Sequence, residues 1–258
     1  MTMKPLIMKF GGASVATPES FQTIAELIVQ RAKDHSQLVV VVSAMAHATD
    51  ELLELARKVH PNPPRREQDM LVSVGERISI SLLAMALSLK GQEAISFTGS
   101  QSGIITNEDH AEAKIVDVRP ARIIKALSQG RIAIVAGFQG VSRQGEITTL
   151  GRGGSDTTAV ALAVALGSDR VEFYKDVGGI FDSDPKVDSS ANLLNHLTFQ
   201  MASDLTGAGA KVLHPRCVSL ALKNGVQLHV LPFAKGITTG SIVGFGAERK
   251  PQCLFEQE

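Results

Sequence analysis

The chain has 258 residues, of which 44% are hydrophobic, with a mean hydropathy of +0.10, so it is long enough to bury a large core. Lys and Arg together number 26, as do Asp and Glu, and this balance excludes the broad electrostatic attraction on which nucleic-acid and membrane-surface binding depend. The two cysteines, Cys217 and Cys253, fit neither a zinc site nor a disulfide framework. No segment has the pattern of a secretory leader or of a membrane helix, which predicts a cytoplasmic protein.

Short apolar runs alternate with longer segments of helical period, which is the pattern of an α/β protein with a mainly parallel sheet. In chain order we expect a strand at 6–10, a helix at 18–34, a strand at 38–42, helices at 50–59 and 67–89, a strand at 94–97, a helix at 120–127, a strand at 132–136, a helix at 156–166, a strand at 171–174, helices at 199–204 and 215–223, and a strand at 227–231. These elements predict one continuous α/β/α unit, followed by a short polar tail at 244–258.

Capping residues predict where two of the helices begin. Thr17 precedes Pro18, so it is expected to cap the first helix. Thr49 is expected to cap the helix at 50–59, whose buried side would carry Leu52, Leu53, Leu55 and Ala56.

The first predicted strand continues into Lys9-Phe10-Gly11-Gly12-Ala13-Ser14. Glycines at the end of a strand let backbone N–H groups approach a polyphosphate, and the lysine supplies a positive charge for the transferring group. A tight turn without a ligand explains the same glycines, so both interpretations stay open. The segment is not a Walker A loop, because Gly-x-x-x-x-Gly-Lys-Ser/Thr is absent.

Two polar side chains stand out in apolar surroundings further along. Ser43 ends the second strand, where open α/β sheets bind ligands, although it could simply terminate the strand. Glu76 lies within an apolar helical pattern. Because burial of an unpaired carboxylate is costly, Glu76 is either a paired structural ion or a site residue.

Residues 148–158, with the sequence Thr-Thr-Leu-Gly-Arg-Gly-Gly-Ser-Asp-Thr-Thr, form the most informative segment and precede an apolar helix. Arg152 offers a planar fork for a substrate carboxylate, and the amides of residues 153–155 form an anion site at the helix start. Asp156 fits this arrangement if it orients lysines and takes part in a Mg²⁺ shell. The alternative is a glycine loop in which Asp156 caps the helix.

Two later segments could contribute to the same site. Residues 174–185 are a strand end followed by a turn-rich loop with three acids, which could hold ribose and adenine or be a solvated turn. Lys211 follows a run of small residues just before a predicted helix, and it could bracket the phosphates from the side opposite Lys9. His214 precedes Pro215 and is expected to be structural.

From Lys9 to Val243, the order and spacing of these segments resemble the amino acid kinase family. The most specific pieces are Lys9-Phe10-Gly11-Gly12, Gly75-Glu76-Arg77, Phe138-Gln139-Gly140, Gly151-Arg152-Gly153-Gly154-Ser155-Asp156, the loop from Asp176 to Asp184-Pro185, and Lys211-Val212-Leu213-His214-Pro215. The resemblance implies a three-layer α/β/α sandwich with a central mainly parallel sheet. It implies a kinase domain over 1–243, with an amino-acid-binding lobe at about 1–167 and an ATP-binding lobe at about 168–243.

The motifs are most similar to those of family members that phosphorylate the side-chain carboxylate of L-aspartate, with ATP and Mg²⁺ as cofactors. The resemblance implies catalytic roles for Lys9, Asp156 and Lys211. It implies that the amino acid is held by Ser43, Thr49, Glu76, Phe138, Arg152, Gly153 and Ser155. It implies that the nucleotide is held by Lys9, Gly11, Gly12, Ser14, Lys175, Asp176, Phe181, Asp184 and Lys211. Mg²⁺ is expected to be bound mainly through the ATP phosphates.

Three positions depart from the family pattern, because Ala13, Lys175 and Phe181 stand where hydroxyl-bearing residues are common. Such kinases commonly continue into paired ACT domains that bind lysine or threonine. None is expected within these 258 residues, whether the chain is a natural unit or part of a longer protein. The expected partners are L-aspartate, ATP and a second copy of the chain, as a homodimer or other homo-oligomer, with no nucleic acid or membrane. The alternatives are a kinase of the same fold acting on glutamate, N-acetylglutamate, carbamate or UMP, and a non-catalytic nucleotide-binding protein.

Overall fold

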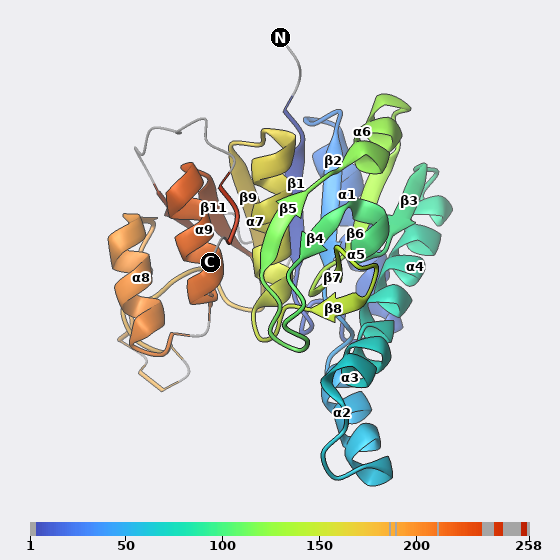
Figure 1. Cartoon of the computed structure of the whole chain (residues 1–258). Coiled ribbons are helices and arrows are strands. Elements are labelled where there is room, and N and C mark those ends of the chain that lie inside the picture. The colour runs from blue at the N-terminus through green and yellow to red at the C-terminus, as the bar shows by residue number, and fades with distance from the viewer. Residues whose placement is uncertain are drawn as a thin grey trace.

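A large central sheet organises the computed structural model, which describes residues 4–185, 187–188, 190–210, 212–233, 240–244 and 254–256. Its strands are β1 (Leu6–Phe10), β2 (Leu38–Val42), β3 (Ala94–Phe97), β6 (Ile132–Ala136), β9 (Arg170–Lys175), β10 (His196–Leu197), β11 (Gln227–Pro232) and β12 (Ser241–Val243). They are ordered β10-β12-β11-β9-β1-β2-β6-β3, and only the β11–β12 pair is antiparallel (Figure 1). The carboxyl ends of β1, β2, β6 and β9 therefore meet at one edge of the sheet, where such folds bind ligands.

Helices cover both faces of this sheet. They are α1 (Pro18–Ala32), α2 (Ala48–Val59), α3 (Arg65–Val72), α4 (Val74–Leu89), α5 (Gly99–Ser102), α6 (Ala121–Ser128), α7 (Gly154–Leu166), α8 (Phe199–Gly207) and α9 (Pro215–Asn224). The side chains of β1 alternate between the two faces, because successive residues of a strand point to opposite sides. Met8 packs in a core cluster with α1 and α4, whereas Ile7 packs in the cluster that contains α7 and α9. The resulting three layers confirm the predicted α/β/α architecture.

A second, smaller sheet lies against the α7 side of the molecule (Figure 1). It consists of β5 (Ile115–Val118), β4 (Ile104–Thr106), β7 (Gln139–Ser142) and β8 (Ile147–Thr149), in that order. The sequence analysis missed all four strands. They have only three or four residues each and carry polar side chains at positions such as Gln139 and Thr149, so they lack the continuous apolar run of a buried strand.

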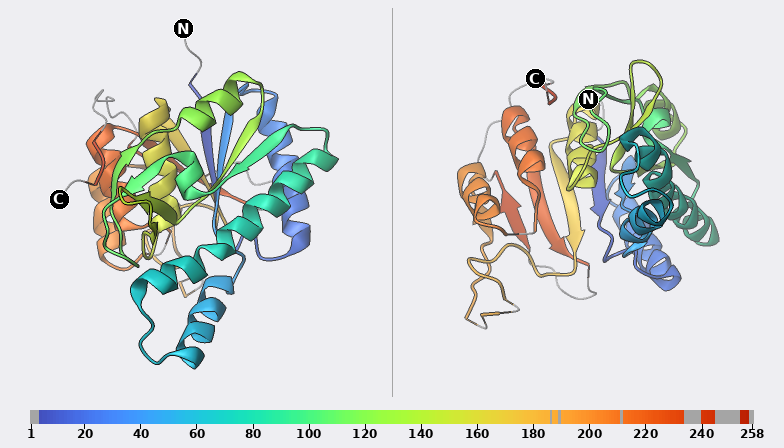
Figure 2. Two further views of the ribbon diagram at one scale, coloured as in Figure 1. Left: turned by 45° about the vertical axis from the view of Figure 1, so that its right-hand side comes forward. Right: turned by 60° about the horizontal axis from the view of Figure 1, so that its bottom comes forward.

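The predicted strands of the central sheet are all present, and Thr17 caps α1 by accepting a hydrogen bond from the Ser20 amide. The expectation for Thr49 was wrong, because α2 begins at Ala48 and Thr49 lies inside its first turn. None of the α2 side chains, all of which are described, is buried, and Leu55 is 53% exposed. Figure 2 gives the reason, because α2 and α3 project together from the body of the protein.

The long helix expected at 67–89 is interrupted at Ser73, between α3 and α4. At this interruption the buried Gln139 side chain donates a 2.9 Å hydrogen bond to the Ser73 carbonyl. By length and composition the segment Arg65–Leu89 could span a membrane, but half of its apolar window is buried inside the protein. We therefore interpret it as a core helix.

The described part of the polar tail also packs on the body. Phe255 is only 8% exposed and joins the core cluster on the α7 side. Glu256 donates its backbone N–H to the Ile115 carbonyl at 2.9 Å and accepts hydrogen bonds from Arg216 on α9. The described part of the predicted polar tail therefore packs against β5 and α9.

Candidate functional site

Lys9 lies near the carboxyl end of β1, just before the Gly11-Gly12 turn, and its side chain is 5% exposed. Its Nζ is 2.5 Å from Oδ1 of Asp156, which lies in the first turn of α7. β1 and α7 are adjacent in the fold, so a separation of 147 positions in the sequence becomes a direct ion pair. The structure thus brings together two of the three predicted catalytic residues, whereas Lys211 lies outside the described residues.

Asp156 also contacts a second lysine. Lys175, the last residue of β9, places its Nζ 3.3 Å from the other carboxylate oxygen. Burial acts to raise the pKa of Asp156, but the two ammonium groups outweigh it and hold the pKa at about 2. The alternative in which Asp156 caps α7 is wrong, because α7 begins at Gly154 and the carboxylate is bound by lysines.

Two largely buried ammonium groups therefore share a single carboxylate. Burial lowers the pKa of Lys9, the neighbouring Lys175 lowers it further, and Asp156 opposes both effects. A buried excess of positive charge is unfavourable unless an anion is added, so this cluster is suited to bind one. The α7 N-terminus adds its partial positive charge at the same place.

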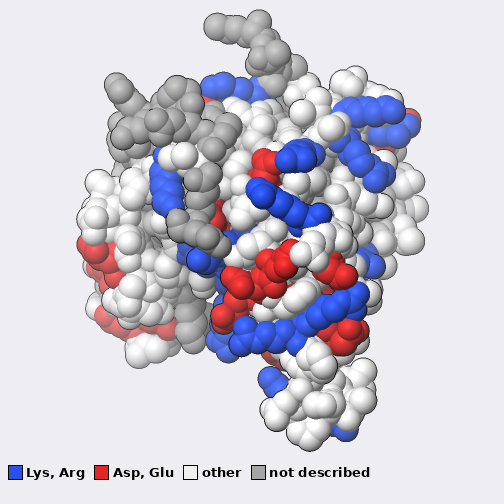
Figure 3. Space-filling view, in the orientation of Figure 1, with Lys and Arg blue, Asp and Glu red and all other residues white. Residues whose placement is uncertain are grey.

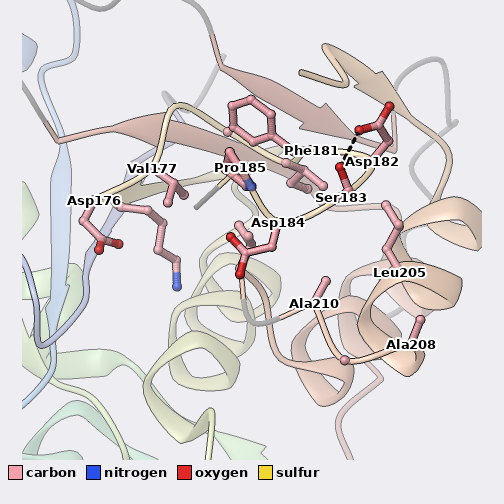
Figure 4. A pocket seen from close by; sticks show the side chains of 15 residues that line it. Asp176, Val177, Phe181, Asp182, Ser183, Asp184, Pro185, Leu205, Ala208 and Ala210 are labelled. Atoms are coloured by element: carbon pink, nitrogen blue, oxygen red, sulfur yellow. Dashed lines mark hydrogen bonds between the residues drawn. The ribbon is translucent and has the colours of Figure 1, made fainter. Parts of the chain in front are cut away.

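A cavity of about 490 Å³ begins at Lys175 and runs along the loop that follows β9. Figure 4 shows Asp176, Val177, Phe181 and Pro185 of this loop across from Leu205, Ala208 and Ala210 at the end of α8. The cavity is mostly apolar with a few carboxylates, which suits a flat heterocycle with polar edges. All four predicted nucleotide-side residues of this segment, namely Lys175, Asp176, Phe181 and Asp184, line it.

Other predicted phosphate-side residues surround the β1 turn. Gly12 lies close to the segment after β2, because a Cβ on Gly12 would be 3.3 Å from the Ala44 carbonyl oxygen. Ser14 is buried, and its hydroxyl donates a 3.2 Å hydrogen bond to the Tyr174 carbonyl. That hydroxyl therefore ties the turn to β9, and its single hydrogen-bond donor is engaged there.

Glu76, in the first turn of α4, lies against the segment that follows β2. Its Oε1 accepts a 3.0 Å hydrogen bond from the Ala44 amide, directly after Ser43. Gly75 permits this approach, because a Cβ there would be 2.8 Å from the Ala44 Cβ. Within the described residues Glu76 has no cationic partner and its Oε2 has no hydrogen bond, and burial raises its pKa to about 7. Among the described residues, this geometry favours a site residue over a paired structural ion.

The Arg152 loop connects β8 to α7. Gly151 and Gly153 both have φ of +71°, and a Cβ on Gly153 would be 2.0 Å from the His214 ring, so both positions require glycine. His214 itself caps α9 by accepting from the Arg216 amide, as its predicted structural role requires. Arg152 is exposed, and no described residue pairs with its guanidinium.

Phe138 and Ser155 lie at the base of this loop, close to the start of α7. Phe138 has φ of +68°, unusual for a bulky residue, and its amide donates a 3.2 Å hydrogen bond to the Thr158 hydroxyl on α7. A Cβ on Gly154 would lie 3.1 Å from the Phe138 ring, and a Cβ on Gly137 would lie 2.7 Å from the Ser155 Cβ. Phe138, Ser155 and Arg152 are thus brought together at the start of α7, whereas Thr49 lies on α2 without a hydrogen bond to this group.

The described residues contain no group of three or more His, Cys, Asp or Glu side chains suited to a metal ion. Figure 3 shows both signs of charge side by side on the face that carries the small sheet, where Arg65, Asp109 and Lys114 help to line a second depression. The sequence analysis missed two features near the site: the contact of Lys175 with Asp156, and the buried Asp69 beneath the Arg152 loop. Asp69 follows the polar run Arg65-Arg66-Glu67-Gln68 at the start of α3, so its sequence surroundings do not distinguish it from a solvent-exposed acid.

Comparison with known proteins identifies relatives for most of the chain. Residues 4–232 match the model of the amino acid kinase family. Aspartokinase of Mycobacterium tuberculosis is 52% identical over 229 residues, covering 88% of this chain and 54% of that protein. The crystal structure of aspartate kinase from Synechocystis superposes with a TM-score of 0.81 at 44% identity, covering 93% of this chain and 39% of that one. The crystal structure of E. coli aspartokinase III in complex with aspartate and ADP superposes with a TM-score of 0.84 at 28% identity, covering 93% of this chain and 64% of that one. The chain spans about half the length of the curated relatives it matches.

Proposed function

The chain belongs to the amino acid kinase family, and from this premise we propose that it transfers the γ-phosphate of ATP to the side-chain carboxylate of L-aspartate, giving 4-phospho-L-aspartate and ADP. The aspartokinase relatives at about 50% identity and the E. coli neighbour that binds aspartate and ADP support this choice of substrates. These are also the substrates that the resemblance of the motifs implies.

The observation that carries the proposal is the ion cluster at the edge of the central sheet. Lys9 and Lys175 share Asp156 and leave one positive charge in excess, and Lys175 also lines the cavity after β9. The phosphate chain of ATP supplies the anion that this cluster needs, and the adenosine occupies the cavity. Lys211 joins them in this proposal, as its neighbours Ala210 and Val212 line the same cavity.

The amino acid is proposed to bind between Glu76 and Arg152. The unpartnered Glu76 oxygen accepts from the α-ammonium of the substrate, and the exposed guanidinium of Arg152 binds a carboxylate through two parallel hydrogen bonds. This pairing selects a substrate with both groups. It disfavours UMP, carbamate and an acetylated amino group.

In the reaction, one oxygen of the substrate β-carboxylate forms a bond to the γ-phosphorus while the bond from that phosphorus to the β,γ-bridging oxygen breaks, and ADP leaves. No general base is required, because the attacking carboxylate is ionised at pH 7. Lys9 and the Gly11-Gly12 amides stabilise the charge on the transferring oxygens, and Asp156 holds the two lysines in place. Catalysis then consists of positioning and electrostatic stabilisation.

Mg²⁺, when bound with ATP, would neutralise charge on the phosphate oxygens. The described residues supply no carboxylate cluster for it, and both oxygens of Asp156 are already engaged by ammonium groups. We therefore assign Asp156 to lysine orientation, and we propose that the ion is bound mainly through the nucleotide.

We further propose a cytoplasmic enzyme that self-associates through the kinase unit. Exposed apolar side chains on α3 and α4 support this, since Met70, Val74, Ile78, Met85 and Leu89 are between 40% and 78% exposed. Light scattering of the purified chain measures its molar mass, and the mass of a monomer would contradict self-association.

Trapping of the acyl phosphate with hydroxylamine tests the proposed reaction. With ATP and Mg²⁺ present, L-aspartate should give a hydroxamate, whereas glutamate and N-acetylglutamate should give at most a few per cent of that rate. If glutamate or N-acetylglutamate reacted faster than L-aspartate, that acceptor would be the substrate instead. Absence of hydroxamate with every carboxylate would favour a non-catalytic nucleotide-binding protein.

A further inference from the structure

Asp69, on α3, is a fully buried carboxylate to which the proposed chemistry gives no role. Its Oδ1 accepts a 2.5 Å hydrogen bond from the Thr149 hydroxyl, and its Oδ2 lies 2.7 Å from Nδ1 of His110. The Ala111 amide donates to both oxygens at 3.1 Å. The carboxylate is thus satisfied entirely by neighbours that lie about 40 and 80 positions away in the sequence.

These partners lie directly under the Arg152 loop. Thr149 is the last residue of β8, three positions before Arg152, and its carbonyl accepts a 2.9 Å hydrogen bond from the Ala113 amide. Gly151 lies against Ala111, because a Cβ on Gly151 would be 3.1 Å from the Ala111 carbonyl oxygen. Asp69 therefore ties α3 to both segments that form the base of the loop.

The backbone at Ala111 indicates that this tie is maintained at a cost. Ala111 has φ of +71°, a left-handed conformation that is unfavourable for a residue with a side chain. Its amide points at Asp69 in that conformation, so the buried carboxylate compensates for the strain. Burial of the carboxylate also costs free energy, and the hydrogen bonds that offset this cost form in this arrangement of the loop.

Arg152 depends on the position of its backbone, because no described side chain holds its guanidinium. We propose that Asp69 is a positioning residue for Arg152, setting the backbone that aims the guanidinium at the carboxylate of the amino acid substrate. The inference rests on the proposed function for the identity of that substrate. A displacement of about 1 Å at such a contact can cost about 100-fold in rate, so an indirect residue can have a large effect.

Steady-state kinetics of Asp69→Ala and Asp69→Asn test the proposal. Asp69→Ala should raise the KM for L-aspartate roughly 10-fold, with less than about a 2-fold change in the KM for ATP. Asp69→Asn should recover most of the loss, because its amide oxygen can still accept from Thr149 and Ala111. Asp117→Ala, which removes a half-buried carboxylate from β5 in the same small sheet, is the matched control and should leave both KM values unchanged.

A double-mutant cycle separates positioning from general loosening of the fold. In an Arg152→Ala background, Asp69→Ala should add less than about 2-fold to the KM for L-aspartate, because the residue through which it acts is gone. An undiminished 10-fold effect in that background, or equal increases in the KM for both substrates, would overturn the proposal. If Asp69→Ala does not fold, Thr149→Val removes one of the hydrogen bonds and takes its place in the cycle.

Hydrogen exchange supplies a readout that does not require turnover. The amides of residues 151–153 should exchange faster in Asp69→Ala, while those of residues 9–12 should not change. If the wild-type chain shows no turnover with L-aspartate, the proposed substrate is wrong. Hydrogen exchange then tests the positioning role of Asp69 by itself. Unchanged protection of the Arg152 loop in the variant would then reject the positioning role.

Discussion

Replacing Glu76 by glutamine is expected to stabilise the free protein at alkaline pH while removing its response to L-aspartate. The carboxylate is 2% exposed, its Oε2 has no described partner, and its pKa is raised from 4.5 to about 7 by burial. Because the native carboxyl holds its proton more tightly than the unfolded one, the free energy of unfolding falls as pH rises from about 4.5 to about 7, and the loss is complete above that range.

The size of the effect follows from the shift. At about 1.4 kcal/mol per pKa unit, the difference of roughly 2.5 units corresponds to about 3.5 kcal/mol as an upper limit. Glutamine keeps the acceptor for the Ala44 amide but buries an NH₂ group, so a net gain of about 1–2 kcal/mol is expected at pH 8. For a chain of this size, that raises Tm by about 2–8 °C.

Thermal unfolding of the wild type and Glu76→Gln at pH 8 and pH 5 measures the gain directly. The variant should be more stable at pH 8 only, since at pH 5 the wild-type carboxyl is already protonated. L-Aspartate should raise the Tm of the wild type at pH 8 and leave that of the variant unchanged. A variant that is less stable than the wild type at pH 8 would mean that Glu76 has a cationic partner, and the assignment to the substrate ammonium would fail.

Three other perturbations follow from the same geometry. The kcat/KM for L-aspartate should fall up to about 10-fold per pH unit below pH 7, as Glu76 is protonated, and a flat profile down to pH 5.5 would contradict the raised pKa. Lys9→Met should lower kcat by about 100-fold or more with little change in Tm, with the exposed Lys58→Met as the control, and near-normal turnover would remove Lys9 from the reaction. Gly153→Ala should destabilise the fold by about 1–3 kcal/mol, since its φ is positive and a Cβ would meet the His214 ring; a Tm within 1 °C of the wild type would show that the loop adapts.

Six strands of the central sheet could be predicted from the sequence because they are mostly apolar runs, as in Leu38–Val42, and buried parallel strands have this composition. The two short edge strands β10 and β12, of two and three residues, were not predicted. The small sheet could not be predicted, because strands such as Ile147–Thr149 are short and polar and become strands only through their partners. The helix α2 was predicted, but its exposure was not, because the helical period of its leucines does not show whether another element packs against them.

The candidate site was predictable where a local motif carries the chemistry. Lys9 with its glycines and Asp156 with its glycine loop were found in this way, and the fold joins them. The contact of Lys175 with Asp156 depends on the pairing of β1 with β9, which no local pattern records. Asp69 was missed for the same reason, because its partners come from a loop and a strand that the sequence did not reveal as neighbours.

Coupled measurement of ADP release at pH 8, with ATP and Mg²⁺ fixed and L-aspartate varied, tests the central claim most directly. The account predicts saturable ADP release that requires L-aspartate and that falls by about 100-fold in Lys9→Met. ADP release that is independent of L-aspartate, or that is unaffected by Lys9→Met, would contradict it.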